Sequence, residues 1–88
     1  MEGFYLENYS YLVILHKVDN MYLVYVPDFD INTEGYDLAD ALTMAKDAIT
    51  ETALALRDSK RKLPLPGSKH YVMLEGDIER YVEVDIGY

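Results

Sequence analysis

The 88-residue sequence predicts one small α+β domain in two layers, with a mostly antiparallel sheet of three or four strands and one long helix on one face. Two strand-like runs, Tyr9–His16 and Tyr22–Val26, stand close together near the start of the chain. The apolar residues then take a period of about 3.6 between Leu38 and Leu56, which indicates an amphipathic helix. Alternation over Tyr81–Ile86 adds a last strand, so the expected order is β-β-(β)-α-β.

The first two strands are expected to form an antiparallel hairpin, because only the short turn His16–Asn20 separates them. Side chains alternate across a strand, so Tyr11, Val13 and Leu15 share one face and the residues between them share the other. Both faces are largely apolar, and a single helix covers only one. We therefore expect a second copy or a different protein to cover the other face, and a homo-oligomer, a dimer or larger, formed through the sheet.

The second strand stops at Pro27, which has no amide to donate to a ladder. Residues 28–37 are rich in acids and turn formers and predict a loop, within which Asn32–Gly35 is expected to form a short third strand. Gly35 stands just before the helix, where we expect it to use the positive φ that glycine tolerates.

The helix is expected to begin after Asp37, which is well placed as its N-cap, with Asp40 at the capping-box position three residues on. Its apolar stripe contains many alanines, so the helix should lie close against the sheet. The stripe consists of Leu38, Ala41, Leu42, Ala45, Ala48, Ile49, Thr52, Ala53 and Leu56.

Three segments connect the helix to the last strand. Arg57–Lys62 holds four of the eight basic residues, which complement the carbonyl end of the helix dipole; a nucleic-acid patch is the alternative. The prolines of Leu63–Ser68 predict a stiff connection, and Tyr71–Leu74 predicts a strand or an ordered loop.

The formal net charge of −8 is distributed unevenly along the chain. Residues 1–56 hold ten acids against Lys17 and Lys46, whereas residues 57–88 hold six acids and six bases. An acidic first half argues against direct contact with a nucleic-acid backbone and suits a basic protein partner, although a negative surface also simply favours solubility. The nine tyrosines belong either in interfaces or at strand positions.

Composition and the N-terminal sequence also predict the cellular location of the protein. Cysteine is absent, so neither disulfides nor a thiolate metal site can stabilise the domain. No apolar run in the sequence has the length of a membrane span, and the N-terminal MEGFYLEN has acids where a signal peptide has bases. We therefore expect a cytoplasmic protein.

A resemblance to a known family centres on the segment from the second strand through the helix. PDF at Pro27–Phe29, TEG at Thr33–Gly35 and DLADAL-x-x-A-x-x-AI at Asp37–Ile49 follow one another in the order and spacing that resemble the HicB-type antitoxin domain of bacterial toxin–antitoxin pairs. Between Phe29 and Thr33 this chain has Asp-Ile-Asn, where the commoner family pattern has a Pro-Gly-containing turn. The resemblance implies a partial ribonuclease H-like fold. It also implies a non-catalytic antitoxin that binds a HicA-type mRNA-cleaving toxin and covers its active surface.

Catalytic and metal-binding chemistry is not expected. Two-metal hydrolysis needs converging carboxylates, and Tyr9–His16 lacks the acid that ribonuclease H-like enzymes place in the middle of the first strand. The acids of Asp28–Asn32 imitate the start of a calcium loop but lack its glycine and its final glutamate. His16 and His70 have no second ligand at metal spacing. We predict a domain that is not an enzyme and has no cofactor.

We expect this chain to bind the toxin through an acidic edge that also carries aromatic side chains. Charge selects the partner, while buried aromatic side chains supply affinity. For the acids, a solvated loop is the alternative, and for Asp37 we favour the helix cap. The residues expected to contact the toxin are Asp28, Phe29, Asp30, Glu34, Tyr36 and Asp40.

Two other functions stay open at this point. One is a solitary adaptor or regulatory module that self-associates through its sheet and has no toxin. The other is a weak metal-dependent ribonuclease that uses Asp28 or Asp30. Relatives often carry a C-terminal helix-turn-helix or ribbon-helix-helix domain, for which a chain ending at Tyr88 leaves no room, so we expect a single domain over residues 1–88 without sequence-specific DNA binding.

Overall fold

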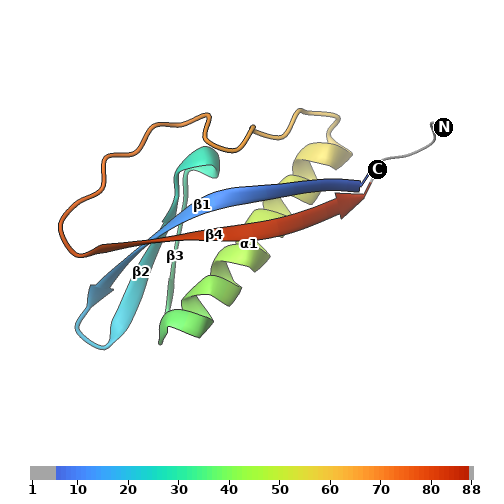
Figure 1. Cartoon of the computed structure of the whole chain (residues 1–88). Helices are drawn as coiled ribbons and strands as arrows, with labels where there is room; N and C mark the ends of the chain where they lie inside the picture. Colours follow the sequence, from blue (N-terminus) through green and yellow to red (C-terminus); the bar gives the residue numbers. More distant parts are fainter. Residues whose placement is uncertain (1–5, 88) are drawn as a thin grey trace.

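One antiparallel sheet with the strand order β3-β2-β1-β4 carries a single long helix on one face in the computed structural model, which describes residues 6–87 (Figure 1). The predicted α+β class and the element order are therefore confirmed. The elements are β1 (Leu6–Val18), β2 (Met21–Val26), one turn of 3-10 helix η1 (Pro27–Phe29), β3 (Ile31–Gly35), α1 (Leu38–Asp58) and β4 (Asp77–Gly87).

The two long strands extend beyond the bounds expected from the sequence, because they pair with each other over nearly their whole length. The register runs from Leu6 opposite Gly87 to His16 opposite Asp77. β4 therefore begins before the clean alternation does. The segment Tyr71–Leu74 belongs to no strand and lies in the connection between α1 and β4.

The core lies between α1 and the face of the sheet that carries Tyr11, Val13 and Leu15, all three fully buried. Valines from β2 and β4 complete that face. From the helix, the predicted stripe contributes Ala41, Ala45, Ile49 and Ala53, which are also fully buried. Small side chains on the helix allow the backbones of the two layers to approach closely, as the alanine-rich stripe predicted.

Gly35 is needed for a different reason from the one expected. Among the described residues, the glycines with positive φ are Gly67 and Gly76, not Gly35. A Cβ added at Gly35 would lie 2.5 Å from Cα and 2.9 Å from Cβ of Ala41, and even closer to its backbone nitrogen. Gly35 thus provides the space in which the first turn of α1 packs on β3, which in turn places the helix N-terminus beside the end of that strand.

The connection between α1 and β4 runs past η1 and then along the outer face of the sheet, opposite the helix (Figure 1). It is fastened first where the hydroxyl of Tyr11 donates to the carbonyl of Pro64, at 2.6 Å. Further on, the ring of Tyr71 packs against that of Tyr25, with 5.6 Å between the ring centres.

The outer face is therefore covered in part by the chain itself, which corrects the expectation that another molecule must cover it. Ile14, on this face, is 2% exposed although no second molecule is present. Its partner in the β1–β2 register is Tyr25, on which Tyr71 packs. Leu23 and Tyr81 remain exposed on the same face, at 45% and 65%.

Candidate functional site

Two aspartates fix the start of α1. The side chain of Asp37 accepts a hydrogen bond from the backbone N–H of Asp40 at 2.7 Å, so the predicted N-cap is confirmed. The carboxylate of Asp40 reaches back in turn and accepts from the N–H of Tyr36 at 2.9 Å. These reciprocal bonds resemble a capping box that extends one residue further back than usual. They hold the backbone of Tyr36 in place, although the residue as a whole is 83% exposed.

Beside this cap lies a surface hollow of about 230 Å³, which we call the Tyr36 hollow. Its apolar walls come from two methionines, at the start of β2 and in the second turn of α1, and from the tyrosine ring. Its two carboxylates come from β3 and from the helix cap. The lining consists of Met21, Glu34, Gly35, Tyr36, Asp40 and Met44.

Two shallower depressions adjoin the Tyr36 hollow and share residues with it. One includes Val18, Met21 and Tyr36, and the other includes Leu23 and Glu34. Val18 and Leu23 are 38% and 45% exposed, so apolar side chains are accessible on both sides of the hollow. Together they form a continuous, partly apolar surface with acidic groups within it.

Asp28 and Phe29 lie at the opposite end of the β2–β3 hairpin. The register places Gly35 opposite Tyr22 and Ile31 opposite Val26, so roughly 13 Å of strand separates the two ends. The expected continuous acidic edge is therefore divided: Glu34, Tyr36 and Asp40 are brought together, and the residues around η1 are not.

Asp28 has a structural role. It is only 6% exposed, and its carboxylate accepts hydrogen bonds from the N–H groups of Gly67 and Lys69, at 2.8 and 3.0 Å. The hydroxyl of Ser68 lies 3.5 Å from the same carboxylate. This aspartate therefore fastens the connection to the turn after β2, and its carboxylate oxygens face the connection and not a partner.

The neighbours of Asp28 differ from it and from each other. Phe29 is half-buried and packs edge-on against Tyr11, with 4.7 Å between the ring centres, so it belongs to the core and not to an exposed anchor. Asp30 is exposed, has a left-handed backbone with φ of 54°, and accepts from the hydroxyl of Tyr25 at 3.0 Å. That bond raises the pKa of the Tyr25 hydroxyl.

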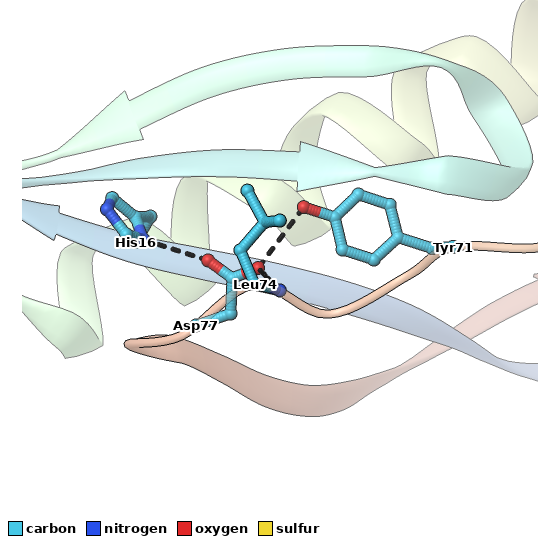
Figure 2. Close-up of polar contacts among 4 residues, drawn as sticks. All are labelled: His16, Tyr71, Leu74 and Asp77. Atoms are coloured by element: carbon cyan, nitrogen blue, oxygen red, sulfur yellow. Dashed lines mark hydrogen bonds and ion pairs between the residues drawn. The ribbon is translucent and has the colours of Figure 1, made fainter.

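A second polar cluster, on the outer face, surrounds Asp77 at the start of β4 (Figure 2). One carboxylate oxygen lies 2.8 Å from Nδ1 of His16 on β1. The other accepts from the N–H of Leu74 at 2.8 Å and from the hydroxyl of Tyr71 at 3.2 Å. These bonds, above all the one from Leu74, hold the pKa of Asp77 below its usual value of 3.8. Burial, followed by the nearby charge of Asp77, raises the pKa of Tyr71.

The hydrogen bonds of the Asp77 cluster link β1, the connection and β4 to one another. A carboxylate that orients a half-exposed imidazole is also how a general base is held. Among the described residues, however, no hydroxyl or amine nucleophile bonds the His16 ring, whose hydrogen-bond partner is Asp77. Sequence reasoning missed this cluster, although Glu75-Gly76-Asp77 has the composition of a turn that precedes a strand.

No protein-family model, curated protein or solved structure matches this chain. Within residues 6–87, no three or more His, Asp or Glu side chains are grouped so as to hold a metal ion. None of the helical segments described there has the apolar length that crossing a bilayer requires.

Proposed function

We propose that this chain is a non-catalytic antitoxin domain that binds a small basic HicA-type toxin, which cuts mRNA, and covers its RNA-binding surface. The observation that carries the proposal is the Tyr36 hollow, where a tyrosine that is 83% exposed lines the same hollow as Glu34 and Asp40. Tyrosine is enriched among the residues that supply binding energy at the centres of interfaces, and here its exposed ring adjoins both apolar and acidic residues.

The segments that carry the family resemblance are also the segments that build this surface. Glu34 and Gly35 belong to the TEG motif, and Asp40 belongs to the DLADAL motif of the helix. The resemblance is one of residue order, whereas the hollow is a feature of the folded chain. Their coincidence supports a partner-binding role for this edge of the domain.

Charge supports the same type of partner. A surface that binds RNA is basic, because it neutralises phosphates with lysine and arginine. The net charge of −8 on this chain would steer such a protein toward it, and the acids at the hollow would select it. Affinity would come from the exposed apolar side chains at and beside the hollow, which are those of Val18, Leu23, Tyr36 and Met44.

Self-association as a solitary module is the second candidate, and the exposed apolar side chains away from the hollow favour it. Leu65, Val72 and Leu74 on the connection and Tyr81 on β4 are 64–68% exposed. A homo-oligomer through this side of the sheet is compatible with toxin binding at the Tyr36 hollow. If self-association is the whole function, the chain should form an oligomer, and no gene for a small basic protein should lie next to its own gene.

The test is co-expression of the chain with the product of the adjacent gene, followed by co-purification and measurement of the dissociation constant. We expect a stable complex, weakened roughly 30-fold or more by Tyr36→Ala, the cost of removing an interface hot spot of about 2 kcal/mol. Tyr81→Ala is the matched control, since Tyr81 is 65% exposed on the strand at the opposite edge of the sheet. Absence of a complex, or equal effects of the two variants, would contradict the proposal.

A further inference from the structure

We propose that the Tyr36 hollow is a receptor for one arginine side chain of a basic protein partner. The proposal rests on the proposed function for the identity of that partner, but its chemistry is argued from the hollow alone. It names the kind of residue on the partner that must be present for recognition.

The volume of the hollow itself suits a single side chain, and the shallow depressions beside it leave room for the rest of the partner. Sites for cofactors and drug-sized ligands usually enclose about 300–1,000 Å³. The Tyr36 hollow encloses about 230 Å³ and is open at the surface, so it suits one extended side chain entering from a neighbouring molecule. An occupant anchored in a larger interface does not need to bind tightly by itself.

Charge requires that the occupant be cationic. The residues that line the hollow include two acids, Glu34 and Asp40, and no basic residue. Within residues 6–87, neither carboxylate forms a salt bridge with another part of the chain. The carboxylate of Asp40 is already held in position by its bond to the Tyr36 N–H, at 2.9 Å, so little ordering is needed when a cation arrives.

The walls favour arginine over lysine or a metal ion. A guanidinium is planar, weakly hydrated and able to stack on an aromatic face, and Tyr36 offers an exposed ring. The thioether side chains of Met21 and Met44 provide an adaptable apolar lining for the aliphatic part of the side chain. Ca²⁺ takes about six to eight oxygen ligands, more than the two carboxylates supply, and no group of three or more possible metal ligands occurs within residues 6–87.

The experiment uses the whole chain and the probe N-acetyl-arginine amide, followed by NMR of ¹³C-labelled methionine methyl groups. A ligand of about 15 non-hydrogen atoms is expected to bind with Kd on the order of 1 mM. The chain has four methionines, so Met21 and Met44 report on the hollow while Met73, on the connection, serves as an internal control. We expect saturable shifts at Met21 and Met44, none at Met73, and at least a tenfold weaker effect from the neutral isostere N-acetyl-citrulline amide.

Variants separate charge from shape. Glu34→Gln is expected to weaken binding of the probe at least fivefold, since it removes one of the two carboxylates and leaves the volume unchanged. Glu51→Gln, an exposed acid on α1 outside the hollow, is the matched control and should have no effect. Equal shifts with the citrulline probe, or equal effects of the two variants, would overturn the proposal. Shifts of Met21 and Met44 that follow protein concentration alone would also overturn it, because a second copy would then occupy the hollow.

Failure of this inference can be distinguished from failure of the proposed function. If the adjacent gene product binds and Glu34→Gln leaves its affinity unchanged, the antitoxin function stands and the arginine receptor is wrong. If the arginine probe binds as expected and the adjacent gene product does not, the receptor stands and the partner has been misidentified.

Discussion

Replacement of Asp28 by asparagine tests whether this residue fastens the connection or contacts a partner. The carboxylate accepts from the N–H groups of Gly67 and Lys69 at 2.8 and 3.0 Å, and both bonds are charge-assisted. Asparagine has one acceptor oxygen and one NH₂ donor, so one of the two N–H groups would face a donor. The free energy of unfolding should fall by about 1.5–3 kcal/mol, the range for one hydrogen bond to a charged group.

The assay is urea denaturation followed by circular dichroism, combined with amide hydrogen exchange at Gly67 and Lys69. For a domain of this size, that loss corresponds to a decrease in Tm of at least about 6 °C, and the two amides should exchange faster. Asp30→Asn is the control, since Asp30 is exposed and asparagine also tolerates its left-handed backbone. The structural role of Asp28 would be refuted if its variant lost less than about 0.5 kcal/mol, as expected for Asp30→Asn.

Three other substitutions test the helix start and the Asp77 cluster. Gly35→Ala should cost about 1–3 kcal/mol in thermal or urea unfolding, because its Cβ would meet Cα of Ala41 at 2.5 Å; a neutral result would contradict the close packing of β3 and α1. Asp37→Ala should cost about 0.5–2 kcal/mol and reduce amide protection in the first turn of α1, and unchanged protection would argue against the cap. The lowered pKa of Asp77 means that its charge stabilises the fold above its usual pKa of 3.8 and that this contribution is lost as the pH falls through the folded-state pKa. The difference in free energy of unfolding between wild type and Asp77→Asn should therefore be largest at neutral pH and decrease in strong acid. A difference that does not change with pH would contradict a stabilising role for the charged Asp77.

Local features of the sequence determined most of the fold. The stripe that begins at Leu38 and the cap at Asp37 predicted the helix and its burial correctly, because period and capping depend on residues a few positions apart. The early start of β4 was not predicted. Arg80 interrupts the apolar alternation on the inner face, and its pairing with Val13 in the long β1–β4 register overrides that local break.

Long-range contacts decided what the sequence could not reveal. Asp28 appears in the sequence as one acid of an exposed loop, and its partners Gly67 and Lys69 lie about forty residues further on. The requirement for Gly35 was recognised, but its cause is proximity to Ala41 and not backbone conformation. In both cases the deciding contact is between two separate segments of the chain, and neither composition nor periodicity shows which segments come into contact.

The candidate site was predictable only in part for the same reason. Glu34, Tyr36 and Asp40 are neighbours in sequence, and their grouping follows from the sharp passage from β3 into α1. Met21 and Met44 complete the hollow from β2 and from the second turn of the helix, and no local pattern connects them.

We propose that this chain neutralises a basic ribonuclease by covering its RNA-binding surface. The most direct measurement is a titration of the purified product of the adjacent gene with this chain, with mRNA cleavage as the signal. We predict that cleavage falls in proportion to added chain and reaches background at a fixed whole-number stoichiometry. Cleavage that persists in the presence of excess chain would contradict the claim.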